Sequence, residues 1–208
     1  MNRGNPAGIS PAGNRFHTER NPMRIIAGTA RSLPLKSLPG SDTRPTTDRI
    51  KETLFNMIQT RVPGSVVLDL FAGSGSLALE AVSRGAEKAV LVENSRKAAA
   101  VIQENINFTK FQSRCNLLVM DALTALPTME RRYVFDLVFL DPPYGKELEI
   151  QALDYLSRSS AITEETLIIV ETSIDTDISV YTRDGIYEIT KDKRYKTNQH
   201  VFLKRVRN

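Results

Sequence analysis

Five short, continuously apolar runs alternate with segments of helical periodicity over most of the chain. The runs cover residues 66–70, 88–92, 115–120, 134–140 and 166–172, and the helical segments between them cover 77–85, 95–108, 122–132 and 146–159. Continuous rather than alternating hydrophobicity is typical of strands that are covered by helices on both faces. The pattern therefore predicts an α/β fold with a doubly wound, mostly parallel sheet.

The two ends of the chain follow other patterns. Residues 185–190 and 199–205 are two further apolar runs, which predict an antiparallel pair closing a seven-stranded sheet. Residues 1–22 are rich in Gly, Pro, Asn and Arg and show no periodicity, so we predict a disordered basic tail.

A small extension is predicted between the tail and the sheet. Residues 23–28 and 32–38 resemble the two arms of a β-hairpin, and apolar side chains at helical spacing predict a helix over 50–59. Thr46 or Thr47 is placed to cap this helix. We therefore expect three parts: a tail (1–22), a hairpin-and-helix extension (23–62) and a main domain (63–208).

Charge is distributed unevenly along the chain. The net charge is +4, but residues 1–65 carry +6, residues 66–190 carry −8 and residues 191–208 carry +6. Basic ends around an acidic middle favour a polyanionic partner held at the periphery, although basic termini also simply increase solubility.

Several classes of protein are disfavoured by composition. Cys115 is the single cysteine, and His17 and His200 have no zinc-ligand spacing relative to it, so we expect neither a disulfide framework nor a metal site. No apolar run is long enough for a membrane span, and the N-terminus lacks the apolar core of a secretion signal. A cytoplasmic protein without a membrane partner is predicted.

The sequence DLFAGSGS follows the first predicted strand and opens a helix. Gly73 and Gly75 allow a ligand to approach the backbone, and the helix amides then face its polar end. The stretch from Gly73 to Ala78 also fits the dinucleotide pattern G-x-G-x-x-G/A. Asp69 distinguishes a dinucleotide from a ligand that carries an ammonium group, because its carboxylate would repel a pyrophosphate and attract an ammonium group.

Two more acidic residues end the next two predicted strands. Glu93 can accept hydrogen bonds from ribose hydroxyls, as in both NAD and S-adenosylmethionine sites, and Asp121 can accept from an adenine amine. Ligands of open α/β sheets bind at the carboxyl ends of the strands. The predicted cofactor contacts are Asp69, Phe71, Gly73, Ser74, Gly75, Glu93, Asn94, Asp121 and Ala122.

The sequence DPPY follows the fourth predicted strand directly and is the most specific signal in the chain. Pro142 and Pro143 favour a rigid extended loop with free carbonyl groups. The Asp141 carboxylate and the Pro142 carbonyl can both accept from one exocyclic amine, while Tyr144 stacks on the base that carries it. We predict that these four residues are catalytic.

The pairing of DLFAGSGS with DPPY resembles the class I amino-methyltransferases, which have a Rossmann-like fold. MRIIAGTARSLPLKS followed by RPTTDRIKETLFNMI resembles the N-terminal signature of the bacterial small-subunit ribosomal RNA guanine-N2 methyltransferases. The resemblance extends from Met23 to Arg205, although Lys196 stands where a glycine is expected. It implies S-adenosylmethionine as cofactor and transfer of its methyl group to a guanine N2 amine in small-subunit ribosomal RNA, within the subunit or an assembly intermediate.

The resemblance and the charge pattern together suggest an RNA-binding surface. Arg44, Thr46, Asp48 and Arg49 match a motif that the family places beside its active site. The predicted RNA contacts form a basic rim around the pocket and comprise Arg24, Arg31, Arg44, Thr46, Arg49, Lys193, Arg194 and Lys196.

Other functions stay open. A DNA amino-methyltransferase acting on adenine N6 or cytosine N4 uses the same loop chemistry, but a chain of 208 residues leaves little room for a sequence-recognition domain. Protein-glutamine methyltransferases carry Asn in place of Asp141. A nucleotide-binding oxidoreductase is favoured only by the glycine pattern, and a non-catalytic ribosome-assembly factor would tolerate loss of the DPPY loop.

Overall fold

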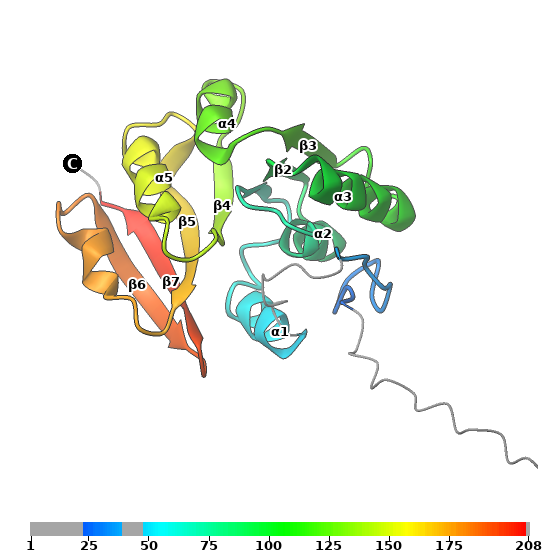
Figure 1. The fold of residues 1–208 in the computed structure, drawn as a ribbon, viewed down its shortest axis with the longest axis horizontal. Helices are drawn as coiled ribbons and strands as arrows, with labels where there is room; N and C mark the ends of the chain where they lie inside the picture. The colour runs from blue at the N-terminus through cyan, green and yellow to red at the C-terminus, as the bar shows by residue number, and fades with distance from the viewer. Residues whose placement is uncertain (1–22, 39–47, 207–208) are drawn as a thin grey trace, which may run out of the picture.

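The computed structural model describes residues 23–38 and 48–206 (Figure 1). The predicted tail, Arg44, Thr46 and the proposed cap at Thr46 or Thr47 lie outside these residues. The strands are β1 (Val66–Asp69), β2 (Lys88–Glu93), β3 (Cys115–Val119), β4 (Phe135–Leu140), β5 (Ile162–Ser173), β6 (Tyr187–Arg194) and β7 (Asn198–Arg205). The helices are α1 (Asp48–Met57), α2 (Ser76–Ser83), α3 (Arg96–Thr109), α4 (Ala122–Met129), α5 (Leu148–Ser157) and the 3-10 helix η1 (Ile178–Thr182).

The strands form one seven-stranded sheet in the order β3-β2-β1-β4-β5-β7-β6. Strands β1 to β5 are parallel to one another, and β7 runs antiparallel to both β5 and β6. The chain order reverses between β1 and β4, which is where ligands bind in doubly wound sheets. The predicted fold class is confirmed.

Each face of the sheet carries its own hydrophobic core. On one face α1, α2, α3 and the N-terminal segment bury side chains such as Phe55, Leu79 and Ile102 against Phe139. On the other face α4, α5 and η1 pack against alternate strand residues such as Leu68. Figure 1 shows the two sets of helices on either side of the sheet. Burial on both faces explains why the strands are continuously apolar.

The structure departs from the predicted elements in several places. β5 begins at Ile162 rather than at residue 166, with a pairing irregularity between Phe135 and Leu137 on β4. η1 was not predicted, because five residues are too few for a recognisable helical period. The helix predicted at 50–59 is present as α1 but starts two residues earlier, at Asp48.

The predicted hairpin at 23–28 and 32–38 is wrong as a pair of regular strands. Arg24 and Pro34 form one isolated antiparallel bridge, supported by backbone hydrogen bonds from Ile25 N to Leu33 O and from Leu35 N to Met23 O. The pairing is limited to this isolated bridge and does not form regular strands. Residues 23–38 nevertheless fold back on themselves, and we call them the N-terminal loop pair.

A buried carboxylate attaches the N-terminal loop pair to the main domain. Glu80 of α2 has no exposed surface, and its oxygens accept from the backbone amides of Ile26 (2.7 Å) and Ala27 (3.0 Å). Arg84 donates to the same carboxylate at 2.7 Å, and Lys51 of α1 lies 3.7 Å from it. One helical side chain thus connects α1, α2 and the loop pair.

None of the described helices is both long enough and apolar enough to cross a membrane. Within residues 23–38 and 48–206, no group of three or more His, Cys, Asp or Glu side chains is arranged to hold a metal ion.

Candidate active site

The carboxyl ends of the parallel strands place five acidic residues along one edge of the sheet. Asp69 ends β1 and pairs in register with Leu91 of β2 and Phe139 of β4. The acidic residues at this edge, from β3 to β5, are Asp121, Glu93, Asp69, Asp141 and Glu171. Four of them were predicted site residues.

The two glycines after β1 have different structural roles. Gly75 precedes α2 with a φ of 77°, and a Cβ there would lie 3.1 Å from Leu91 and 3.3 Å from Ile102. Gly73 has a φ of 56°, and a Cβ there would meet no atom within 4 Å. Gly75 therefore lets the loop pack against the sheet, whereas the space beside Gly73 is open to a ligand.

Glu93 joins this glycine loop to the loop after β2. One of its oxygens accepts from the Gly73 amide at 2.9 Å, and the other accepts from the Ser95 amide at 2.8 Å. Each carboxylate oxygen can accept a further hydrogen bond, so both can still receive ribose hydroxyls. The predicted ribose contact remains compatible with this arrangement.

Asp121 caps α4 from an exposed position. Its Oδ1 atom accepts from the amides of Leu123 (3.0 Å) and Thr124 (3.1 Å). In the predicted contact, Oδ2 would therefore be the atom that accepts from the adenine amine. Ala122, the other predicted residue of this loop, is buried.

The remaining predicted cofactor residues surround the glycine loop. Phe71 is half-buried against the core on the α4 and α5 side, and Asn94 is exposed at the end of β2. The Ser74 hydroxyl lies 3.1 Å from the sulfur of Met23, so the N-terminal loop pair touches the glycine loop. Nothing in these positions contradicts the predicted contacts.

Asp69 is a buried carboxylate with few hydrogen bonds. It is 1% exposed and accepts from the Ala78 amide at 3.3 Å. Burial raises the pKa of Asp69 to about 7, and the nearby Glu93 charge adds to this effect, while the Ala78 amide opposes it. A cation bound beside Asp69 would stabilise the ionised form.

The DPPY loop lies between β4 and α5. Asp141 is partly buried, and burial raises its pKa well above the ordinary range, with further contributions from the charges of Glu171 and Asp69. Pro142 is buried, Pro143 is exposed, and the Tyr144 side chain is 54% exposed. A base can therefore reach Tyr144 from solvent.

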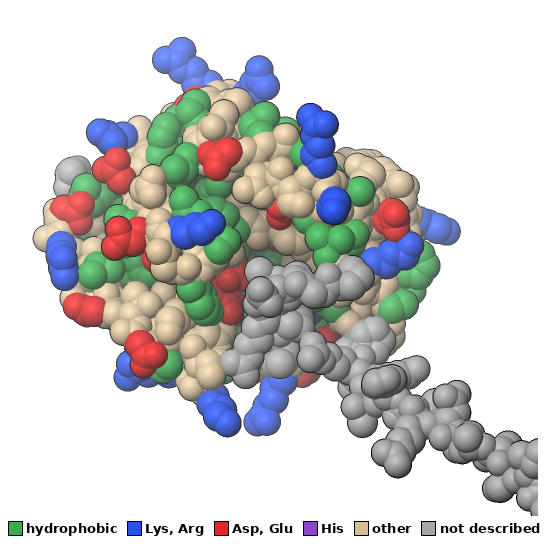
Figure 2. Space-filling view, viewed as in Figure 1, with side chains coloured by type: hydrophobic (Ala, Val, Ile, Leu, Met, Phe, Trp, Pro, Cys, Tyr) green, Lys and Arg blue, Asp and Glu red, His purple; other side chains and the backbone are tan. Residues whose placement is uncertain are grey.

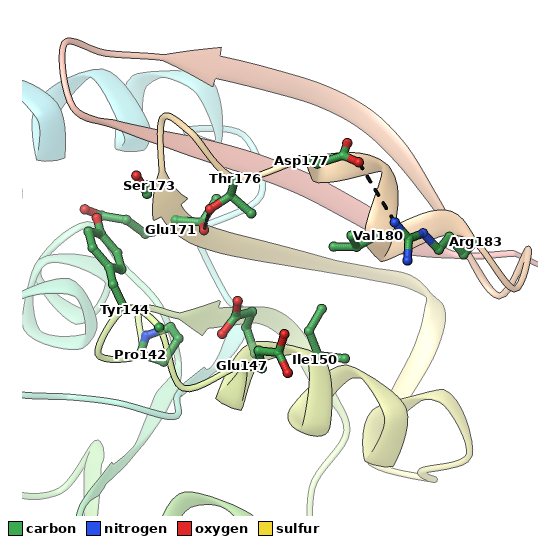
Figure 3. Close-up of a pocket in the computed structure, with 13 residues that line it drawn as sticks. Pro142, Tyr144, Glu147, Ile150, Glu171, Ser173, Thr176, Asp177, Val180 and Arg183 are labelled. Carbon is green, nitrogen blue, oxygen red and sulfur yellow. Dashed lines mark hydrogen bonds and ion pairs between the residues drawn. The ribbon is translucent and has the colours of Figure 1, made fainter.

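A cavity of about 420 Å³ adjoins the DPPY loop (Figure 3). It lies between this loop, the start of α5, the end of β5 and η1. Its charged lining residues are Glu147, Glu149, Glu171, Asp177 and Arg183, and Asp177 lies 4.0 Å from Arg183. A mostly acidic lining suits a ligand rich in N–H donors and disfavours a phosphate.

Glu171 was not among the predicted site residues, although it lies near the end of β5, at the same edge of the sheet as the other acids. Its oxygens accept from Asn198 Nδ2 at 2.6 Å and pair with His200 Nε2 at 3.0 Å, both on β7. Tyr195 Oη lies 3.3 Å from the other nitrogen of His200. The signal available in the sequence was a carboxylate that follows the apolar residues 167–170 within the predicted strand at 166–172.

The described residues of the predicted basic rim are exposed but do not line the cavity. Arg24 pairs with Asp48 at 2.8 Å. Arg31 and Arg49 belong to the N-terminal loop pair and α1, while Lys193, Arg194 and Lys196 lie at the β6–β7 turn. Figure 1 shows α1 and this turn toward the same end of the molecule, where Figure 2 shows projecting Lys and Arg side chains.

The chain is similar to known proteins over most of its length. The profile of a family described as conserved hypothetical protein 95 matches residues 23–204. Ribosomal RNA small subunit methyltransferase D of Haemophilus influenzae is 39% identical over 154 residues, covering 74% of this chain and 80% of the relative. The Escherichia coli protein of the same name is 34% identical over 161 residues, covering 76% of this chain and 79% of the relative.

Solved structures share the fold. The Escherichia coli protein yhhF superposes with a TM-score of 0.77 at 30% identity, covering 88% of this chain and 97% of that one. A more distant methyltransferase structure, solved with S-adenosylhomocysteine, has a TM-score of 0.60 at 15% identity. The match covers 72% of this chain and 49% of that one, and at this identity it shows the fold alone. Both the profile match and the identity to the small-subunit enzymes extend over most of the chain, which therefore belongs to the bacterial small-subunit ribosomal RNA methyltransferase family.

Proposed function

We propose that this chain transfers the methyl group of S-adenosylmethionine to the exocyclic N2 amine of a guanine in small-subunit ribosomal RNA. The observation that carries this proposal is the position of Asp141. The negative charges of Asp69, beside the glycine loop, and of Glu171, beside the large cavity, both raise the pKa of the Asp141 carboxyl. Asp141 therefore lies between these two parts of the site. A methyl donor bound at the first and a base bound at the second would meet at Asp141.

The donor set beside the glycine loop fits S-adenosylmethionine. Asp69 would hold the ammonium group, Glu93 the ribose hydroxyls and Asp121 the adenine amine, while the open side of Gly73 leaves room for the ligand. A pyrophosphate would face the Asp69 carboxylate without a compensating cation, which disfavours a dinucleotide. When bound, S-adenosylmethionine supplies a methyl group on a positively charged sulfur.

The DPPY loop would orient the amine for attack. The Asp141 carboxylate and the Pro142 carbonyl accept its two N–H bonds, and Tyr144 stacks on the base. S-adenosylmethionine would supply the methyl group, and the sulfur would keep the electron pair of the broken S–CH3 bond. The ionised form of Asp141 would stabilise the positive charge that grows on nitrogen and would then take a proton from it, a transfer that the raised pKa of Asp141 favours.

The activity is tested by incubating the protein with labelled S-adenosylmethionine and small ribosomal subunits that lack the modification. Nucleoside analysis should recover the label in N2-methylguanosine. Label in N6-methyladenosine or N4-methylcytidine would instead identify a different amino-methyltransferase. Naked ribosomal RNA and assembly intermediates serve as parallel substrates to identify the particle that is recognised.

Cofactor binding is expected to depend on pH through Asp69. Because the pKa of Asp69 is about 7 in the free protein, a cofactor ammonium must displace a proton below that pH. The dissociation constant of S-adenosylhomocysteine should therefore rise by up to about tenfold per pH unit below 7 and level off between pH 7.5 and 8. Calorimetry of Asp69→Asn should give weak binding without this dependence. A persistent pH dependence in that variant would assign it to another group.

RNA binding is expected to weaken steeply with salt if the exposed basic residues contact phosphates. The log–log slope should be about −0.7 to −0.9 per neutralised phosphate, and Lys193→Ala with Lys196→Ala should reduce its magnitude by up to about 2. Arg132→Ala is a matched control, because Arg132 is an exposed residue just before β4. It therefore lies at the amino ends of the parallel strands, away from the β6–β7 turn. Filter binding to small subunits measures the slopes. Equal slopes for all three proteins would remove the β6–β7 turn from the RNA surface.

A further inference from the structure

We propose that Glu171 selects guanine by accepting the hydrogen bond of its N1–H, next to the amine that Asp141 holds. The inference rests on the proposed amine methylation and adds the residue that distinguishes one base from the others. It draws on the pairing of β4 with β5, the two cavities that Glu171 lines, and its two buried hydrogen-bond partners.

The bases differ at the ring nitrogen beside the exocyclic amine. In guanine the N2 amine is followed by N1–H, which is a donor. In adenine the N6 amine is followed by N1, and in cytosine the N4 amine is followed by N3, and both of these ring nitrogens are acceptors. Two adjacent carboxylates therefore match the donor–donor edge of guanine, whereas an acceptor nitrogen facing a carboxylate is repelled and unpaired.

Asp141 and Glu171 are placed to contact adjacent groups of one ligand. Leu140 of β4 pairs in register with Val170 of β5, so the next residue on each strand is one of the two acids. Both carboxylates line a small cavity of about 10 Å³ that also includes His200. Glu171 additionally lines the large cavity next to Tyr144, where a base would stack.

Two side chains of β7 fix the position of the Glu171 carboxylate. Asn198 Nδ2 donates to one oxygen at 2.6 Å, and His200, which is 1% exposed, lies with Nε2 3.0 Å from the other. A carboxylate only accepts, so His200 Nε2 donates to Glu171, while the other ring nitrogen of His200 lies 3.3 Å from the Tyr195 hydroxyl. His200 and Asn198 are therefore positioning residues, and each Glu171 oxygen can still accept from a ligand.

The test compares two bases that carry the same amine. After the methylated guanosine has been located by mass spectrometry, small subunits are reconstituted with guanosine or 2-aminopurine ribonucleoside at that position. 2-Aminopurine keeps the 2-amino group, but its N1 is an acceptor. We expect wild type to prefer guanosine, measured as a ratio of kcat/KM values, by roughly tenfold to a hundredfold.

Glu171→Gln is the decisive variant, because an amide can donate a hydrogen bond to an acceptor nitrogen. The guanosine to 2-aminopurine ratio should fall by at least about tenfold. Glu165→Gln is the matched control, since Glu165 lies on the same strand with an 85% exposed side chain paired to Lys204. Its ratio should equal that of wild type. If Glu171→Gln does not fold, Asn198→Ala serves in its place, with an expected drop of about threefold to tenfold.

The outcomes separate this inference from the proposed function. An unchanged ratio in folded Glu171→Gln, with wild-type methylation of guanosine, overturns selection by Glu171 and leaves the amine methylation intact. Failure of wild type to methylate guanine in any substrate overturns the proposed function itself. A ratio that falls in Glu171→Gln but not in Glu165→Gln supports both.

Discussion

Replacing Asp141 with Ala is expected to slow the methyl-transfer step by about a hundredfold or more, the cost of losing one preorganised electrostatic partner of the transition state. The variant removes the acceptor that orients the amine and the group that receives its proton. Cofactor affinity should change little, because the predicted cofactor contacts lie on the loops after β1, β2 and β3. Single-turnover transfer of labelled methyl groups to small subunits measures the step.

Two further variants separate orientation from proton acceptance. Asp141→Asn keeps an acceptor oxygen but cannot take the proton, so its rate should lie between those of wild type and Asp141→Ala. Asp154→Ala is the matched control, because Asp154 is an exposed carboxylate on α5 that pairs with Arg158. Wild-type rates in Asp141→Ala would mean that the DPPY loop is a structural turn, and the proposed chemistry would be wrong.

The regular part of the fold was predictable from local pattern alone. The central stretches of β1, β2, β4 and β5 are buried on both faces, so each is a continuous apolar run that stands out from the helices around it. The acids that follow these runs lie along a common edge of the sheet, because the carboxyl ends of parallel strands point the same way. That is why the sequence predicts that Asp69, Glu93, Asp121 and Asp141 share one site.

Features that depend on pairing between distant segments were not predictable in the same way. Glu171 ends an apolar run like the other acids, but its significance comes from His200, 29 residues later on an antiparallel strand. Glu80 looks like an ordinary polar position in the helix predicted at 77–85. Its partners Ile26 and Ala27 lie more than 50 residues earlier, in a segment whose pairing is too short to form strands.

Glu80→Gln is expected to be the most destabilising conservative change in the described part of the chain, at about 3–5 kcal/mol of the free energy of unfolding. The glutamine is similar in size but carries no charge, and its NH2 group must face donors that the carboxylate now satisfies. Lys51, whose side chain is 1% exposed, would lose its buried counter-charge. Burial already lowers the pKa of Lys51, and the Glu80 charge is the main opposing effect.

Glu80→Gln should also weaken the attachment of the N-terminal loop pair, because the amides of Ile26 and Ala27 donate to the Glu80 carboxylate of α2. Urea denaturation measures the free energy, and limited proteolysis reports release of the loop pair. Asp154→Asn, which breaks the exposed pair with Arg158, should cost no more than about 1 kcal/mol. Adding Lys51→Met to Glu80→Gln should recover part of the loss, because no unpaired lysine then remains buried. A Glu80→Gln variant as stable as Asp154→Asn would show that the buried carboxylate does not anchor the loop pair.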